Sequence, residues 1–235
     1  MDDSLTTRSA IKETLPTVFG YLGIGIAFGV IGRASGFSTW QIVLMSLIIY
    51  AGSSQFTTVS LLAAATPVSS IILATFLVNS RMILMSTTLA PYFKRESTAK
   101  NLLLGTLLTD ESFALGMNKL NYTEGKLSFT WFNTANWIAY LTWAGASAIG
   151  SLLGGIVGDP KQLGLDFAIV AMFMGLLYLQ LITDRSLPRS LQLLVVGITL
   201  ILTYLGMIFL PSNLVIIVVT LIGCGLGVWL KHAFF

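Results

Sequence analysis

Residues 68–93, VSSIILATFLVNSRMILMSTTLAPYF, form one apolar run between Pro67 and Lys94. A helix of about 20 such residues is long enough to cross the hydrocarbon core of a bilayer. Two polar side chains, Asn79 and Arg81, interrupt the run near its middle. A charge at the bilayer centre costs at least about 2.5 to 3.5 kcal/mol, so it is retained chiefly where cargo or protons pass. The run predicts a transmembrane helix that carries a polar site at mid-depth.

The rest of the chain has the same apolar character. Of its 235 residues, 55% are hydrophobic and 10% are charged, against roughly 25% charged in an average soluble domain. The candidate spans are residues 15–32, 40–66, 68–93, 101–116, 129–150, 165–182, 191–210 and 214–229. The sequence therefore predicts an all-α polytopic membrane bundle of about seven or eight transmembrane helices. We expect one transmembrane domain over 1–235, in the cytoplasmic (inner) membrane.

Basic residues do not decide the orientation of such a bundle. With eight single crossings, seven Lys and Arg fall on the N-terminal side and five on the opposite side, and this difference is too small to apply the positive-inside rule. A half-helix at the second or fourth candidate would change the side of the following loops. Sidedness therefore stays open from the sequence alone.

A second polar cluster lies in the middle of residues 40–66. It reads YAGSSQF, and its candidate site residues are Tyr50, Gly52, Ser53, Ser54, Gln55 and Phe56. Glycine followed by two serines and a glutamine weakens a helix and offers side-chain hydrogen bonds in place of backbone ones. We therefore expect a discontinuous helix near Gly52, whose exposed amides could receive a carboxylate. The alternative is ordinary polar contact between helices.

The acidic pair Asp110 and Glu111 is predicted to lie at the depth of Arg81. Arg81 and Asp110 lie thirteen and ten residues from Lys94 and Lys100 respectively, which places both roughly 15 to 20 Å from one loop. In an antiparallel hairpin, the guanidinium would pair with one carboxylate. Adjacent helical residues point about 100° apart, so the other acid would remain and could take up a proton. A purely structural ion pair is the alternative.

Other features favour packing or exclude enzyme classes. Glycines four apart, such as Gly25 with Gly29 and Gly150 with Gly154, favour close helix contact, and Asn133 and Asn136 are further candidates for a polar cavity. The sequence has no phosphate-binding loop of the G-x-x-x-x-G-K-[ST] type. One cysteine and one histidine make a metal site improbable. A serine protease at Ser147 would lack a well-placed base. We expect neither an enzyme nor a cofactor.

Several motifs resemble the AzlC-type branched-chain amino acid exporters. They are Pro16 and Gly20 leading into GIAFGV, the Gly36-Phe37 turn, YAGSSQF, LVNSRM, LAPYF and TDESFAL, within residues 15–118. The resemblance implies export of leucine, isoleucine and valine, with methionine as a further candidate. It also implies a small, separately encoded AzlD-like membrane subunit as partner.

These observations combine into one hypothesis, a proton-coupled secondary exporter that works as an antiporter. The substrate carboxylate would lie near residues 52–55 or Arg81, and its ammonium near Asp110 or Glu111. Asn79 belongs to the same polar path, and the aliphatic side chain would rest among neighbours such as Phe56 and Phe113. The rival hypotheses are a passive amino acid channel and a membrane scaffold that transports nothing.

Overall fold

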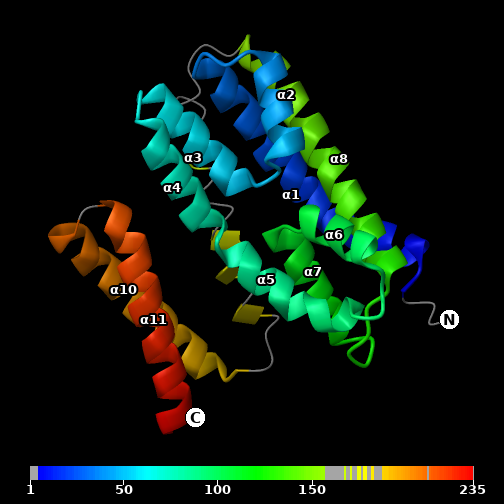
Figure 1. Cartoon of the computed structure of the whole chain (residues 1–235), viewed down its shortest axis with the longest axis vertical. Coiled ribbons are helices and arrows are strands. Elements are labelled where there is room, and N and C mark those ends of the chain that lie inside the picture. Colours follow the sequence, from blue (N-terminus) through cyan, green and yellow to red (C-terminus); the bar gives the residue numbers. More distant parts are fainter. Residues whose placement is uncertain are drawn as a thin grey trace. The chain divides into compact units, whose positions relative to one another are not determined.

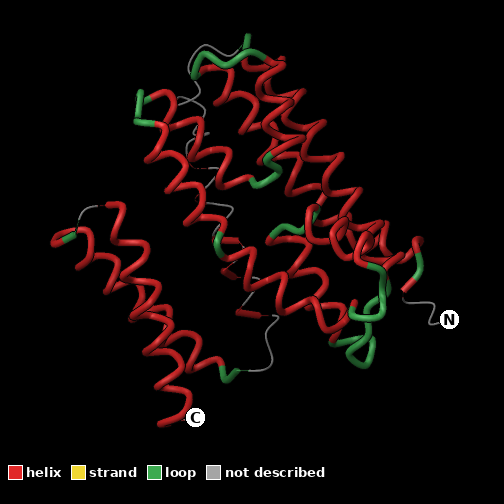
Figure 2. The backbone as a smooth tube through the Cα atoms, in the orientation of Figure 1, coloured by secondary structure: helices red, strands yellow, loops and turns green. Residues whose placement is uncertain are grey.

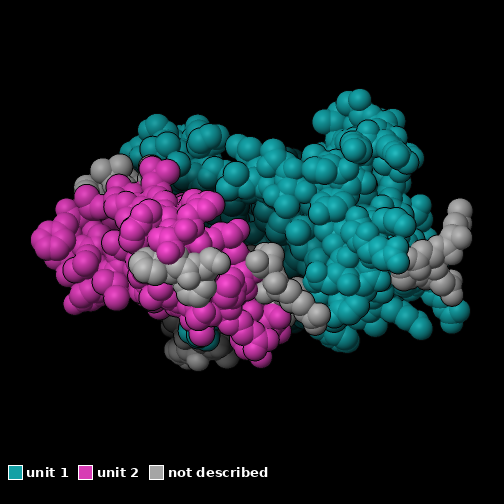
Figure 3. Space-filling model, turned by 90° about the horizontal axis from the view of Figure 1, so that it is seen from below, with its two compact units in different colours: residues 1–176 teal, residues 177–235 magenta. Residues whose placement is uncertain are grey.

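The computed structural model of the protein describes residues 5–156, 187–210 and 212–234, with isolated positions between 167 and 182. These residues form helices joined by loops, and Figure 2 shows no strand among them. The chain divides into two compact units, residues 1–176 and 177–235 (Figure 3). The predicted all-α fold is therefore confirmed, whereas a single domain over 1–235 stays a prediction.

Two long parallel helices, α1 (Thr7–Ala34) and α8 (Phe129–Gly154), form the core of the first unit (Figure 1). α1 begins before the predicted residue 15, because Thr6 and Ser9 form a capping box that satisfies its first amides. Ser128 caps α8 by accepting from the amide of Trp131.

Small residues bring α1 and α8 into backbone contact. A Cβ on Gly25 would lie 2.7 Å from that of Ala146. A Cβ on Gly29 would overlap the backbone of Ser147, and one on Gly150 would overlap that of Ile26. Close approach of this kind replaces the hydrophobic effect as the basis of helix association in lipid. The predicted packing role of these glycines is confirmed.

The second candidate span, residues 40–66, forms two short helices. α2 (Thr39–Ile48) and α3 (Gly52–Ala63) are separated by residues 49–51. Tyr50 has a φ of 42°, in the left-handed region that an aromatic residue adopts only under strain. The discontinuity predicted near Gly52 is therefore confirmed.

Both outer ends of this α2–α3 pair lie where α1 ends. Thr39, at the start of α2, is 2.9 Å from the hydroxyl of Ser151 near the end of α8. After the break, α3 starts beside Trp143. Four residues after Gly52, Phe56 packs edge to face against Phe28, which lies in the second half of α1, toward its end. The pair thus reaches the middle of the unit and returns to the side it came from (Figure 1).

Residues 68–93 cross the whole unit. They form α4 (Val68–Asn79), α5 (Arg81–Leu89) and the short 3₁₀-helix η2 (Ala90–Phe93). The outer bounds agree with the predicted run, but the break at Ser80 was not predicted. It is one residue long, and its backbone keeps helical angles, φ −57° and ψ −26°. α4 packs against α3, whereas Phe93 lies in an apolar cluster with Ala10, near the start of α1.

The fourth candidate span, residues 101–116, is also divided. α6 (Thr98–Thr106) and α7 (Asp110–Leu120) are separated by residues 107–109. Thr109 caps α7 in a capping box with Ser112. A polar side chain thus satisfies the first amides of α7, which would otherwise lack partners.

We call the side on which α1 begins the N-side and the opposite side the far side. The α6–α7 pair comes from the N-side. The ammonium of Lys100 on α6 lies 4.8 Å from the ring centre of Phe129, at the start of α8. On α7, Lys119 forms an ion pair of 2.6 Å with Glu13, in the second turn of α1. α6 therefore runs from the N-side to the middle, and α7 returns.

One arrangement thus occurs twice in opposite directions. α1 crosses from the N-side and is followed by the α2–α3 pair on the far side. α4, α5 and η2 cross back and are followed by the α6–α7 pair on the N-side (Figure 1). Inverted repeats with broken helices are common in secondary transporters, where the breaks meet near the bilayer midplane.

The second unit contains the antiparallel helices α10 (Arg189–Phe209) and α11 (Ser212–Phe234). Gly206 lies against Val215, and Gly227 against Val195. Candidate span 165–182 lies mostly outside the described residues. Within the described part, three helical segments are long and apolar enough to cross a membrane by themselves, namely Thr7–Ala34, Val68–Phe93 and Arg189–Phe209. The predicted count of seven or eight spans stays a prediction.

Candidate functional site

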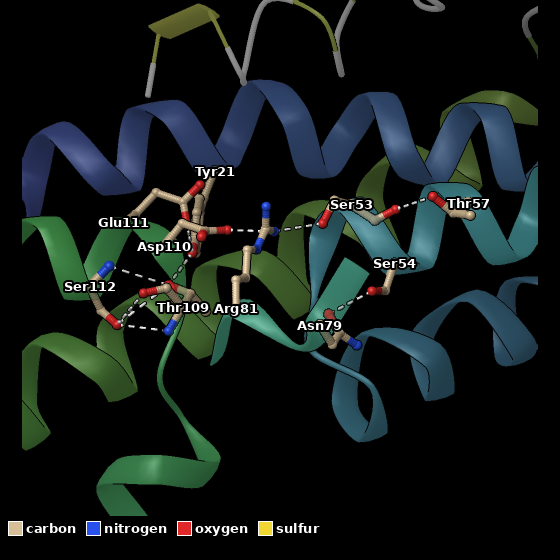
Figure 4. A network of polar contacts seen from close by, with 10 residues as sticks. All are labelled: Tyr21, Ser53, Ser54, Thr57, Asn79, Arg81, Thr109, Asp110, Glu111 and Ser112. Carbon is tan, nitrogen blue, oxygen red and sulfur yellow. Dashed lines mark hydrogen bonds and ion pairs between the residues drawn. The ribbon is translucent and has the colours of Figure 1, made fainter. Parts of the chain in front are cut away.

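An ion pair connects the broken helices. Arg81, the first residue of α5, and Asp110, the first residue of α7, approach to 2.7 Å between Nη2 and Oδ2. The same Nη2 donates to Ser53 Oγ in the first turn of α3, at 2.8 Å (Figure 4). The Arg81 guanidinium therefore contacts Ser53 and Asp110, which follow the α2–α3 and α6–α7 breaks. Arg81 itself follows the break at Ser80. The pairing expected from the sequence is present.

Glu111 has different surroundings from its neighbour. The Tyr21 hydroxyl lies 2.7 Å from Glu111 Oε2 and 2.7 Å from Thr109 Oγ1. None of the ion pairs in the described part of the chain includes Glu111. As helix geometry predicts, the two acids face different partners, and Asp110 is the one that faces a cation within these residues.

Residues of the YAGSSQF segment divide into two groups. Ser54 donates to Asn79 Oδ1 at 2.6 Å. Gln55 donates to Ser46 at 3.0 Å and accepts from the indole of Trp143 at 2.9 Å. Ser54 and Gln55, both fully buried, thus make the interhelical contacts of the alternative interpretation, and Asn79 takes part in them. Gly52 and Ser53 instead face the space between the breaks, near Arg81 and Asp110.

A small hollow of about 20 Å³ lies between the breaks. Its lining comes from α1, from α8 and from the residues at or just before the starts of α3, α5 and α7: Tyr21, Tyr50, Ala51, Gly52, Ser53, Arg81, Met82, Thr109, Asp110, Glu111 and Trp143. This volume holds about one water molecule. It is too small for an amino acid, so a substrate could bind here only after the surrounding helices move apart.

Two features of the lining leave polar groups for a ligand. Tyr50 is 6% exposed, and among the described residues its hydroxyl has no hydrogen bond of normal geometry, although it lies beside Tyr21 and Thr109. At the start of α3, Ala51 is the N-cap, and no side chain caps it. The first amides of α3 therefore resemble the anion-binding end of a half-helix.

Phe56 and Phe113 are not brought together. Phe56 packs with Phe28 in the cluster toward the far side. Phe113 packs against the N-side cluster that contains Leu108. Neither ring lines the hollow, so their place beside the aliphatic substrate side chain stays a prediction.

The remaining candidates lie on α8. Asn136 is fully buried, and neither atom of its amide has a hydrogen-bond partner in the described part of the chain. It does not line the hollow, and neither does Asn133. Ser147 donates to the carbonyl of Trp143 at 2.8 Å within the α1–α8 contact, which is a helix-packing environment.

Five lining residues were not among the predicted site residues: Tyr21, Ala51, Met82, Thr109 and Trp143. Thr109 could have been found, because a threonine followed by acidic residues and Ser112 is typical of a helix N-cap. Tyr21 and Trp143 lie within apolar runs and near glycines, and nothing local distinguishes them from packing residues. Their position becomes visible only when α1 and α8 are placed side by side.

Comparisons with known proteins identify relatives of this chain. The sequence model of the family described as AzlC protein matches residues 16–157. The chain is similar to the branched-chain amino acid transport protein AzlC of Bacillus subtilis (strain 168), 30% identical over 89% of this chain and 82% of that one. It is also similar to the inner membrane protein YgaZ of Escherichia coli (strain K12), 30% identical over 84% of this chain and 83% of that one.

An uncharacterized membrane protein of Helicobacter pylori (strain ATCC 700392 / 26695) is 29% identical over 71% of this chain and 72% of its own length. No solved structure matches. The predicted location in the cytoplasmic membrane is confirmed by these membrane relatives and by the apolar helices. The chain is a multi-pass membrane protein that belongs to the AzlC family.

Proposed function

We propose that this protein is a secondary transporter that exports branched-chain amino acids. The observation that carries the proposal is the Arg81–Asp110 ion pair at the meeting point of the broken helices. Such a pair is complementary to a zwitterion, and its cost in lipid favours a transport role. The name of the Bacillus subtilis relative supports branched-chain amino acids as the substrate class.

The polar lining supports one orientation of the substrate. Its carboxylate binds the uncapped amides at the start of α3, where Ser53 and Arg81 meet. Its ammonium binds Asp110, which exchanges its contact with Arg81 for one with the substrate. The Tyr50 hydroxyl donates to the substrate carboxylate. This hydroxyl is buried and makes no hydrogen bond of normal geometry with the described residues.

Glu111 is the residue that carries the coupling proton. It lies against the hydroxyl of Tyr21, which also contacts Thr109, and forms no ion pair with a described residue, so its charge is less well compensated than that of Asp110. A proton on Glu111 weakens the attraction for the substrate ammonium and promotes release. Antiport follows when substrate and proton occupy the centre in alternation.

The distribution of basic residues supports an inward-facing N-side. Of the nine Lys and Arg in residues 5–156, only Arg33 is at the far side and Arg81 is central. The other seven are on the N-side: Arg8, Lys12, Lys94, Arg95, Lys100, Lys119 and Lys126. Under the positive-inside rule the N-side faces the cytoplasm. Export then runs from the N-side to the far side.

The small AzlD-like subunit remains part of the proposal on the strength of the family resemblance. The decisive experiment measures counterflow of labelled leucine and valine in liposomes, with and without that subunit. We expect flux with the unaltered protein, and loss of flux when Arg81→Ala is combined with Asp110→Asn. Normal valine flux in this double variant would refute the site.

Collapse of the proton gradient distinguishes the mechanisms. A coupled exporter loses accumulation but retains exchange, whereas a passive channel shows neither accumulation nor dependence on the gradient. If the small subunit alone supports flux, this chain is a scaffold and the proposal is wrong.

A further inference from the structure

A second, larger cavity lies on the N-side of the polar centre. It is lined by α5, η2 and α6 together with the start of α8, and its volume is about 230 Å³. It is open on one side, where Ala90, Asn101 and Gly105 are exposed. Its walls include Leu89, Phe93, Leu104, Leu108 and Phe132. The polar side chains in the lining are Ser86 and Asn101. The cavity therefore offers an apolar environment with few polar groups.

The cavity continues the lining of the central hollow along α5. Met82 lines the hollow, and Ser86 and Leu89, four and seven residues later, line the cavity. Residues at this spacing share one face of a helix. On the opposite wall, Leu108 lines the cavity, and Thr109 and Asp110, which follow it directly, line the hollow. Leu108, only 6% exposed, lies at the junction.

The size and chemistry of the cavity suit an aliphatic side chain. An apolar protein cavity of roughly 150 Å³ accepts benzene, a guest of about six carbons, so the N-side cavity can hold a branched chain of three or four carbons. The central hollow, at about 20 Å³, cannot. The polar centre thus has groups for the charges of an amino acid, and the N-side cavity has space for its side chain.

We propose that the N-side cavity binds the branched aliphatic side chain of the substrate and selects it by size, before its charged groups enter the polar centre. This inference rests on the proposed function. Leu108 separates the two sites and moves with the α6–α7 break when the substrate advances. Substrate preference is therefore set outside the polar centre, by the walls of this cavity.

Gly105 offers a direct test. It lines the cavity, and a Cβ built on it meets no atom within 4 Å, so the side chain of Gly105→Leu begins in open space at the cavity wall. Gly145→Leu is the matched control, because Gly145 is exposed on α8 and its Cβ is equally free. Ala90→Leu, from the opposite wall, provides a second variant if Gly105→Leu folds poorly.

Flux of leucine and valine is measured for each variant in liposomes. We expect Gly105→Leu to lower kcat/KM at least about tenfold for leucine and less for valine, since one methylene in an apolar pocket changes selectivity by about 10-fold or more. Gly145→Leu should behave like the unaltered protein. Equal loss for both substrates would mean that lipid or a neighbouring chain occupies the cavity, and unchanged flux would mean that the substrate does not enter it. Either result overturns the inference.

The outcome also separates this inference from the proposed function. If the unaltered protein transports leucine and the Arg81→Ala, Asp110→Asn double variant does not, the proposed function stands whatever Gly105→Leu does. If the unaltered protein transports neither amino acid, the proposed function fails and the cavity inference fails with it.

Discussion

Asp110 and Glu111 are neighbours on α7, yet among the described residues Asp110 contacts a cation and Glu111 does not. Breaking a buried ion pair by removing one partner costs about 3 to 5 kcal/mol, although the 32% exposure of the Arg81 side chain reduces this cost here. Loss of Asp110 therefore removes the carboxylate that compensates this guanidinium, which keeps its hydrogen bond to Ser53 (Figure 4). Loss of the Glu111 charge breaks none of the ion pairs in the described part of the chain.

We predict that Glu111→Gln separates exchange from coupling. The amide can still accept from the Tyr21 hydroxyl but cannot take up a proton, so counterflow of leucine should continue while accumulation driven by a pH gradient is lost. Asp110→Asn should lose both activities. The two activities are measured in the same liposome preparation, and accumulation that survives in Glu111→Gln would refute its role as the proton carrier.

Tyr50→Phe tests the hydroxyl that has no hydrogen bond of normal geometry in the described part of the chain. The ring contact with Tyr140, 4.8 Å between centres, should persist, so the thermal midpoint should not fall. KM for leucine should rise about tenfold or more, because a hydrogen bond to a charged group contributes about 1.5 to 3 kcal/mol.

Tyr140→Phe is the matched control, since its hydroxyl donates to the carbonyl of Leu47 and does not line the hollow. An unchanged KM in Tyr50→Phe would show that this hydroxyl does not reach the substrate.

At the scale of elements, the unbroken helices differ from the broken ones in how they are held. α1 and α8 meet through glycines along their length, whereas α3, α5 and α7 begin in the interior and are connected through single polar contacts. The breaks at Tyr50, Ser80 and residues 107–109 are therefore the places where the unit can change shape with the smallest loss of packing.

Gly29→Leu should disrupt the α1–α8 contact. A side chain there meets backbone atoms of Ser147 and Ser151 that cannot rotate away, so we expect at least about the 1 to 3 kcal/mol typical of overpacking. Thermal unfolding in detergent measures the loss, with Gly145→Leu as control because its Cβ is free. A Gly29→Leu protein as stable as the control would show that the two helices lie further apart.

Part of the helical structure could be predicted from the sequence, because it follows from apolar length and end residues. The bounds of residues 68–93 and the break near Gly52 are examples, since Pro67, Lys94 and the YAGSSQF segment are local features. The break at Ser80 has no such feature, because serine is tolerated within helices and the break depends on contacts of Asn79 and Arg81 with α3 and α7. Tyr21 and Trp143 were missed because their roles depend on helices distant in the sequence.

At the scale of the whole molecule, the half-helix pairs determine which loops share a side. The turns after α3 and after α7 would both be on the N-side if residues 40–66 and 101–116 were single crossings. With two half-helix pairs they lie on opposite sides (Figure 1). This difference makes the topology testable without a substrate.

We predict opposite accessibility for cysteines at two exposed turn positions, Ala64→Cys and Glu124→Cys, introduced with Cys224→Ser because Cys224 is exposed. A membrane-impermeant maleimide should label Ala64→Cys in intact cells and Glu124→Cys only in inverted vesicles. Labelling of both from the same side would contradict the half-helix pairs, and the reverse pattern would contradict the inward N-side.

The contact between Tyr21 and Glu111 has an electrical consequence. Tyr21 lies about halfway along α1, which runs from Thr7 to Ala34. Since a full crossing of one elementary charge is worth about 2.3 kcal/mol per 100 mV, a proton that reaches Glu111 from either aqueous phase has crossed roughly half of the membrane voltage, or about 1.2 kcal/mol per 100 mV. Proton binding at this depth would therefore respond to the resting potential of the cell as well as to its pH.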